Sequence, residues 1–597
     1  MGGERLGRAP GSRGLPGYDV TLCAPKSVSV LWGLSDDARV RAAVDTAHEK
    51  AVVTALRYVE LHAGYTRRAD PVNPKRMIVE GLFGLSGVRY EHRTSRAGDP
   101  HVHSHVLVNN KQRCVDGKFR TIDGVSVYHE ARAAGMVYQA QLRAELSASL
   151  RVEWGEVRNG CAEIVGLDDV EVLDGFSTRR REIDAWREAH GIGSDGDRNP
   201  VVDAALARVG QKKTRQIKDV DTPIEQLREQ WVASPAGRKA KRFIDRVSVD
   251  SARSGDAEMP TVAQVVNAVI AERSTFTRAD LCEAAAALVP SGVAGEVLYD
   301  RLEDLVDEVM ATGAAWSVTP EKDRDVDLRM REGSQRFTAE PVVEEINRGI
   351  DLATAEIHRG VDASMIHPVE GQLSVDQARA MRTVVASEFL TSVVVAPAGA
   401  GKTSSLKAAR RAWETAGKTV VGLAPTGKAA DVMVSEAVAH ESSTIARVLH
   451  HTDAMSAGEI AAHVGWGDDT VVVVDEAGMV GNHDAVRILE VATVAGARVV
   501  FVGDPHQYAP VKARSGLLGT LAYELPDAVE LTEVFRQHDP VERRVSKWLR
   551  DGDQALVEQA ARWYADQGRL HAGSITAMLG DAMAGGQVRV SGVSSFR

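Results

Sequence analysis

Four histidines lie close together in the stretch EHRTSRAGDPHVHSHVLVNN, at positions 92, 101, 103 and 105. If residues 101–110 form a β-strand, successive side chains point to opposite faces. His101, His103, His105 and Asn109 then share one face, whereas Val102, Ser104, Val106 and Val108 share the other. The pattern therefore predicts a strand with a valine-rich core face and a polar face of imidazoles.

The imidazole face has the chemistry of a divalent-metal site. Two histidines at positions i and i+2 of a strand present neighbouring nitrogen ligands, and a third from nearby completes the set. His92 is the natural third ligand, because the turn at Gly98-Asp99-Pro100 brings it back beside the strand. The alternatives are a cluster of hydrogen-bonded surface histidines and a zinc hydrolase, although no HExxH motif accompanies the cluster.

The elements around the histidines suggest three regions. Before the histidine strand, residues 18–32 alternate like a half-buried strand that breaks at Ala24-Pro25, and a helix is expected from about Asp36 to Leu61. Helices continue to about residue 238. Residues 239–351 read as mostly helical and carry no recognisable chemistry, and residues 352–597 contain short apolar strands alternating with helices. That alternation is typical of a parallel α/β sheet.

The N-terminal motifs resemble a known family. HRTSRAGDPHVHSHVLVNN, together with GYDVTLCAPKSVSVLWGL and FSTRRREIDAWREAHG, is similar to conjugative relaxases of the TrwC/TraI type, the MobF class. The resemblance implies an antiparallel-sheet HUH relaxase domain over residues 1–238. It further implies a divalent metal, Mg or Mn, held by His92, His103 and His105, with Asp19 orienting a histidine ligand. Single-stranded DNA at a transfer origin and other proteins of the conjugation apparatus are the implied partners.

The relaxase resemblance raises the question of a nucleophile. In that family a tyrosine ahead of the APKSVS segment forms a covalent phosphotyrosine with DNA, and no tyrosine precedes that strand here. Strand alternation puts Asp19, Thr21 and Cys23 on one face, so Tyr18 is expected to point away from the metal. We therefore expect the relaxase region to lack its N-terminal nucleophile segment, with no nucleophilic tyrosine found.

The C-terminal region contains a phosphate-binding motif. APAGAGKTSS at 396–405 follows an apolar strand and opens a helix, which is the context of a Walker A loop. Backbone N–H groups around Gly399 and Gly401 would hold the phosphates of ATP, with Lys402 reaching them and Thr403 ligating Mg²⁺. VVVVDEAGMV supplies the Walker B pair, in which Asp475 would belong to the Mg²⁺ shell and Glu476 would be the base that orients the attacking water.

The stretches around this motif resemble superfamily 1 helicases of the RecD-like type, through LSVDQARAM, APTGKAA, STIARVLHH, GDPHQYAPV and LTEVFRQ. The resemblance implies that Gln377 reads adenine, Gln507 senses the γ-phosphate and Arg536 contacts phosphate. It implies a RecA-like first lobe over residues 352–597 that follows a helical linker at 239–351. Since the later motifs of the second lobe are not evident, we expect that lobe to be largely absent and ATP hydrolysis to be weak.

The overall composition agrees with several domains. The chain has 597 residues and a net charge of −11, which argues against a uniformly basic nucleic-acid coat, although Lys and Arg outnumber Asp and Glu over residues 1–120. Scattered cysteines, no secretory signal and no apolar run long enough for a bilayer indicate a cytoplasmic protein without membrane insertion. Three hypotheses compete: a relaxase-helicase, a remnant that binds DNA and ATP without completing either reaction, and an unrelated P-loop ATPase.

Overall fold

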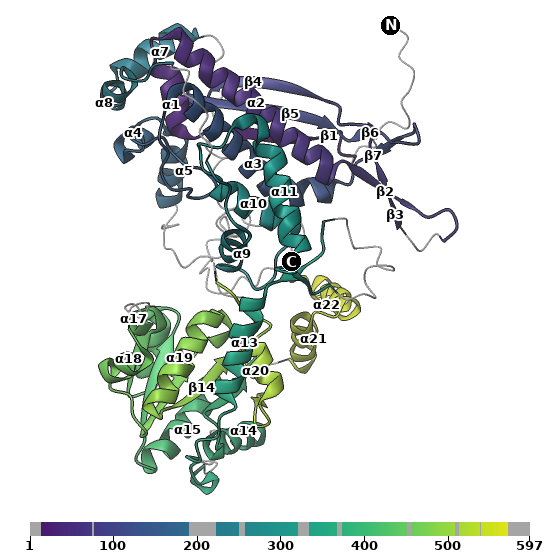
Figure 1. Ribbon diagram of the computed structural model, residues 1–597. Helices are drawn as coiled ribbons and strands as arrows, with labels where there is room; N and C mark the ends of the chain where they lie inside the picture. Colours follow the sequence, from purple (N-terminus) through teal and green to yellow (C-terminus); the bar gives the residue numbers. More distant parts are fainter. Residues whose placement is uncertain are drawn as a thin grey trace. The chain divides into compact units, whose positions relative to one another are not determined.

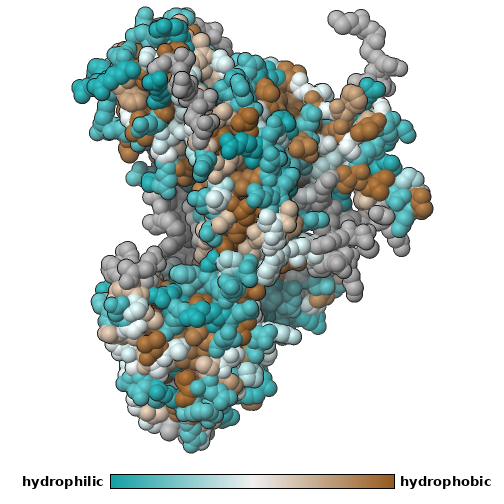
Figure 2. Space-filling model, viewed as in Figure 1, coloured by the Kyte–Doolittle hydropathy of each residue, from teal (hydrophilic) through white to brown (hydrophobic). Residues whose placement is uncertain are grey.

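The computed structural model describes residues 14–73, 77–189, 222–249, 257–319, 333–366, 373–449, 455–507, 513–537 and 539–570. These residues form two compact units (Figure 1), the first built mainly from residues before 267 and from 276–337, the second from 267–275 and 338–570. Each unit has its own sheet and hydrophobic core. On the face shown in Figure 2, hydrophobic residues are interspersed with hydrophilic ones. No helix in the described ranges is long and apolar enough to cross a membrane.

An antiparallel sheet organises the first unit. Its strands run in the order β1 (Gly17–Cys23), β5 (Pro100–Asn109) and β4 (Gly87–Thr94), with the histidine strand β5 in the centre (Figure 1). Val102, Ser104, Val106 and Val108 are buried, and they alternate with side chains on the opposite face of β5. The predicted strand and its two faces are therefore confirmed.

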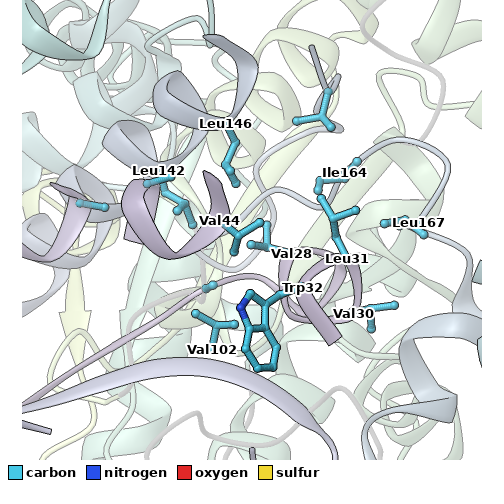
Figure 3. Close-up of a cluster of buried hydrophobic side chains, with 14 of the residues drawn as sticks. Val28, Val30, Leu31, Trp32, Val44, Val102, Leu142, Leu146, Ile164 and Leu167 are labelled. Carbon is cyan, nitrogen blue, oxygen red and sulfur yellow. The ribbon is translucent and has the colours of Figure 1, made fainter. Parts of the chain in front are cut away.

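Three helices cover the valine face of this sheet: α1 (Lys26–Leu34), α2 (Ala38–Ala63) and α3 (Gly124–Leu150). The N-terminal caps of α2 and α3 are Asp37 and Asp123, whose carboxylates accept backbone N–H groups of the first turn. Figure 3 shows Trp32, Val44, Val102, Leu142 and Leu146 converging in one core. Helix α2 matches the helix predicted from about residue 36 to residue 61.

The segment after Ala24-Pro25 differs from the sequence-based expectation. Its Ser-Val-Ser-Val alternation favoured a strand, but the residues form α1, which is buried almost throughout. A helix buried on all sides shows no polar face, so its periodicity cannot be read from the sequence. The Glu163 carboxylate accepts hydrogen bonds from the backbone N–H groups of Lys26 and Ser27, at 3.3 and 2.8 Å, and thereby satisfies the start of the helix.

Shorter elements complete the first unit. They are the hairpin β2 (Tyr65–Ala69) and β3 (Met77–Gly81), the hairpin β6 (Lys111–Arg113) and β7 (Phe119–Thr121), and α4 (Val170–Gly175), α5 (Thr178–Ala189), α7 (Ile224–Ala233) and α8 (Pro235–Ile244). From the predicted middle region come α10 (Arg278–Leu288), α11 (Gly295–Ala311) and β8 (Trp316–Ser317), whereas β9 (Phe337–Thr338) has one residue in each unit. Helices α10 and α11 pack on α3, where Arg143 and Gln141 donate hydrogen bonds to the carbonyls of Ala286 and Gly295, each at 3.0 Å.

The predicted middle region therefore contributes to both units. Helix α9 (Val262–Ile270) has residues in each, and α13 (Glu340–Ala353) packs in the second unit against α19 (Asn482–Ala495). The division into regions 1–238, 239–351 and 352–597 stays a prediction.

The second unit is a parallel α/β domain, as its strand pattern predicted. Its strands pair in the order β12 (Glu441–Thr444), β11 (Thr419–Ala424), β13 (Thr470–Val474), β14 (Arg498–Gly503), β10 (Thr391–Val395) and β15 (Val529–Glu530), all parallel. Separate hydrophobic clusters lie on the two faces of the sheet. The helical elements are η1 (Ala363–Met365), α14 (Val375–Ala386), α15 (Lys402–Thr415), α16 (Gly427–Ser435), α17 (Ile445–Leu449), α18 (Ala457–Val464), η2 (Ala477–Met479), α19, α20 (Leu517–Glu524), α21 (Pro540–Asp551) and α22 (Gln554–Asp566).

Candidate metal centre and nucleotide site

The three predicted ligand histidines come together on one face of the antiparallel sheet. His92 on β4 is directly paired with His103 on β5, and His105 lies two residues further along β5. The ring centroids are 5.0 Å apart for His92 and His103, 5.4 Å for His92 and His105, and 5.3 Å for His103 and His105. One nitrogen from each ring lies within 4.8 Å of the others. Three imidazoles converging in this way fit a divalent metal.

Hydrogen bonds orient two of these rings. The Nδ1 atom of His103 lies 2.9 Å from the carbonyl oxygen of His101, which makes Nδ1 the donor nitrogen. The Nδ1 atom of His105 lies 3.0 Å from both carboxylate oxygens of Asp19 and 3.0 Å from the Thr21 hydroxyl oxygen. Both rings therefore keep Nε2 as the lone-pair nitrogen for a metal. Asp19 thus contacts a candidate ligand, as the orienting role predicted for it requires, and that role stays a prediction. Thr21 is a further contact of His105 that we did not predict.

His101 lies beside the three-histidine centre and outside it. Its ring stacks obliquely on His103, with centroids 4.3 Å apart, and burial lowers the pKa of His101 to about 3. Among the described residues, the other group with metal-ligand geometry is Glu80, Cys114 and Asp116. There Arg120 forms ion pairs with Glu80 at 3.1 Å and Asp116 at 2.6 Å, so the carboxylates of that group are already paired with a guanidinium.

A buried histidine supports β5 from behind the histidine centre. His48 of α2 places Nε2 2.8 Å from the Ser104 hydroxyl and Nδ1 2.8 Å from the Tyr138 hydroxyl. Burial lowers the pKa of His48 to about 3, so the ring is neutral near pH 7. Ser104 lies between two candidate ligands, His103 and His105, so this contact helps to hold the strand that carries them. No sequence pattern marks His48, because its partners are distant in the chain.

Tyr18 occupies the opposite face of β1 from Asp19, as strand alternation predicted. Its ring packs edge-on against Tyr128 of α3 with centroids 6.2 Å apart, and a Cβ atom at Gly124 would overlap its hydroxyl. Burial raises the pKa of Tyr18, which disfavours the phenolate. Tyr18 is therefore poorly placed to attack a phosphate at the histidine centre.

The second unit holds a Walker A loop between β10 and α15. Gly399 and Gly401 have φ angles of 84° and 76°, a conformation that glycine adopts without steric cost. These turns place backbone N–H groups at the start of α15, where the helix dipole also favours phosphate. Thr403 lies in the first turn of that helix, the position predicted to ligate Mg²⁺.

Lys402 lies against the Walker B carboxylates. Its Nζ is 2.6 Å from Asp475 Oδ1 and 2.7 Å from Glu476 Oε1. Burial of the ammonium would lower the pKa of Lys402, but the two carboxylates outweigh it and raise that pKa. Glu476 has a φ of 53°, a left-handed conformation that is costly for a non-glycine residue and often found at functional sites. The sequence-predicted lysine and acidic pair thus meet in space.

The remaining predicted nucleotide-site residues surround this loop. The Gln377 side chain is buried beneath it and donates to the Ala400 carbonyl at 2.9 Å. Arg536 is exposed, and its neighbour Phe535 donates a backbone hydrogen bond to the Gly399 carbonyl at 2.8 Å. Gln507 is exposed in the turn after β14, the strand beside β10.

Sequence reasoning missed Arg550 of α21. Its Nε lies 3.2 and 3.1 Å from the two carboxylate oxygens of Asp504, in the same turn as Gln507. The Asp504 side chain is 3% exposed and that of Arg550 is 16% exposed, so the pair is largely shielded from water. No motif marks this arginine, because only the packing of α21 brings it to the turn.

Two families match this chain, each over a part of one unit. Residues 1–236 match the TrwC relaxase family, and residues 372–574 match the family described as AAA domain. The chain carries a TrwC relaxase domain and an AAA domain. The relaxase domain contains the three-histidine centre, and the AAA domain contains the Walker A and B motifs. The family resemblance and the fold class predicted from the sequence are confirmed.

Curated relatives include conjugation proteins and a helicase. The chain is 35% identical over 209 residues to the probable conjugal transfer protein TraA of Sinorhizobium fredii, covering 33% of this chain and 17% of that protein. It is 30% identical over 296 residues to the multifunctional conjugation protein TraI of Escherichia coli, covering 46% and 15%. The ATP-dependent RecD2 DNA helicase of Deinococcus radiodurans is 37% identical over 140 residues, covering 23% and 18%. The chain thus spans less than a fifth of the length of these relatives.

Solved structures of the conjugative relaxase TrwC with oriT DNA are also similar to this chain. A metal-bound complex is 24% identical, has a TM-score of 0.35 and covers 42% of this chain and 80% of that one. A copper-bound complex is 25% identical, has a TM-score of 0.33 and covers 40% and 72%.

Proposed function

We propose that the relaxase domain binds a divalent metal through His92, His103 and His105 and acts on single-stranded DNA at a transfer origin. The observation that carries the proposal is the convergence of the three rings, two of them oriented by hydrogen bonds at Nδ1, which makes Nε2 the nitrogen that would ligate a metal. Mg²⁺ or Mn²⁺ is the proposed metal. When bound, it would act as a Lewis acid on the phosphate to be cleaved.

The chain's own residues would fix the geometry of that reaction. Asp19 holds His105 in one tautomer and orientation, and the His101 carbonyl does the same for His103. The proposed chemistry is a transesterification in which a tyrosine hydroxyl attacks the phosphorus and the DNA 3′-hydroxyl leaves, so the phosphodiester energy is kept for rejoining. Tyr18 is not proposed as that nucleophile, because its ring packs against α3.

We propose in addition that the AAA domain binds ATP with Mg²⁺. Lys402 would exchange its two carboxylate partners for phosphate oxygens, which would release Asp475 for the Mg²⁺ shell and Glu476 for the attacking water. Gln377, Gln507 and Arg536 are proposed contacts to the nucleotide. Other conjugation proteins are proposed partners, since curated relatives are named for conjugal transfer.

The proposal for the relaxase domain is tested by metal binding and adduct formation on the same chain. Calorimetric titration with Mn²⁺ is expected to show one site that His103→Ala removes, with Cys114→Ala as a matched control elsewhere in the domain. Incubation with single-stranded origin DNA and Mn²⁺, followed by a denaturing gel, tests for a protein–DNA adduct. No covalent band is expected, because no tyrosine of this chain is predicted to be the nucleophile, and peptide mapping would identify the attached tyrosine in any band that forms. Metal binding that survives loss of His103 would refute the proposed site.

A further inference from the structure

The face that carries the histidine centre extends beyond it along the sheet. Strand pairing aligns residues of β1, β5 and β4 in three rows, which are Cys23, His103 and His92, then Thr21, His105 and Tyr90, then Asp19, Leu107 and Val88. Directly paired residues of antiparallel strands point to the same face. Tyr90 therefore lies on the histidine face, across the strand pair from His105.

The salt bridges of β4 confirm which way Tyr90 points. Arg93 forms an ion pair with Asp45 of α2 at 2.8 Å, and Arg89 forms one with Glu49 of α2 at 3.3 Å. These arginines alternate with Tyr90 along the strand, so the tyrosine projects away from α2 and toward the histidine face.

An exposed apolar surface surrounds Tyr90. Tyr90 is 50% exposed, Val88 52% and Leu107 42%, although an apolar side chain gains by being covered. Asp19, the carboxylate in these rows, is hydrogen-bonded to His105. The surface therefore presents an aromatic ring and two aliphatic side chains, and the neighbouring Asp19 carboxylate is directed to the His105 imidazole. We call Val88, Tyr90 and Leu107 the Tyr90 platform.

We propose that the Tyr90 platform stacks on a nucleobase of single-stranded DNA next to the phosphate bound at the histidine centre. This inference rests on the proposed function, because the occupant is chosen by the adjoining site. Tyr90 lies two residues from His92 along β4, or about 7 Å, a separation that the base of a neighbouring nucleotide spans. Aromatic rings bind bases of any sequence in this way, since every base has a π-face.

Stacking requires an aromatic ring at position 90 but does not require the tyrosine hydroxyl. Tyr90→Phe and Tyr90→Ala therefore separate stacking from any chemical use of the hydroxyl. Tyr128 provides a matched control, because it is 69% exposed and contacts Tyr18 on the opposite face of β1.

The experiment measures binding of fluorescein-labelled oligothymidylate to the full chain in Mn²⁺ by fluorescence anisotropy. Tyr90→Ala is expected to weaken binding about 5- to 150-fold, the range for loss of one stacked base. Tyr90→Phe and Tyr128→Ala are expected to keep the wild-type affinity, and all three variants to keep the wild-type affinity for Mn²⁺.

Four results would overturn the inference. Wild-type binding by Tyr90→Ala would show that no base stacks there, and an equal loss in Tyr90→Phe would assign the hydroxyl to the DNA contact. Self-association of the wild type that Tyr90→Ala abolishes, measured by sedimentation, would assign the platform to a second copy of the chain. A wild-type chain that binds Mn²⁺ but no oligothymidylate would instead refute the proposed function together with the inference.

Discussion

Replacement of Asp19 tests whether a carboxylate outside the metal ligands tunes the histidine centre. Both Asp19 oxygens lie 3.0 Å from His105 Nδ1, so Asp19→Ala removes the acceptor that holds this ring with Nε2 free. Such outer partners change metal affinity by roughly 10- to 100-fold. The side chains of Asp19 and His105 are 48% and 33% exposed, so water replaces part of the lost interaction. We therefore expect the lower end, about 10-fold or ~1.4 kcal/mol, in the Kd for Mn²⁺.

Calorimetric titration of the full chain with Mn²⁺ measures this change. Asp19→Asn keeps one oxygen acceptor and is expected to lose less affinity than Asp19→Ala. Glu156→Gln serves as a control, because Glu156 is an exposed carboxylate paired with Arg158. If Asp19→Ala binds Mn²⁺ as tightly as the wild type while His103→Ala does not bind, the reasoning about ring orientation is refuted.

Three further outcomes are expected. Tyr18→Phe does not abolish any protein–DNA adduct that the chain forms on a denaturing gel, since the Tyr18 hydroxyl packs at Gly124; a band lost in this variant would contradict the face assignment. Lys402→Ala weakens binding of a fluorescent ATP analogue at least about tenfold, because the ammonium group that would bind the phosphates is lost. Unchanged binding would argue against the P-loop assignment. The pKa of His48 is about 3 when folded against 6.5 ordinarily, so the unfolded chain takes up the proton first. Unfolding free energy then falls below pH 6.5 by up to about 1.4 kcal/mol per pH unit, and His48→Gln flattens this slope in denaturant titrations at several pH values.

Local periodicity explains the parts of the fold that could be predicted. The alternation in β5 identifies its two faces without reference to any other strand, and the apolar spacing of α2 identifies a helix in the same way. The glycines of the Walker A loop are equally local, because their left-handed φ angles serve a turn made by consecutive residues. Helix α1 could not be predicted in this way, because it is buried on every side and has no polar face to mark helical spacing.

The sequence by itself determined which groups could do chemistry here: imidazoles on one strand face, a phosphate-binding loop, and a lysine and two carboxylates to serve it. Tertiary structure decided which of them meet. Pairing of β4 with β5 places His92 opposite His103 and sets Tyr90 beside His105, and pairing of β1 with β5 brings Asp19 to His105. The same holds for Arg550 and Asp504, and for His48 and Ser104. These contacts depend on strand register and helix packing, which arise from the burial of many side chains at once and leave no mark in any short stretch of sequence.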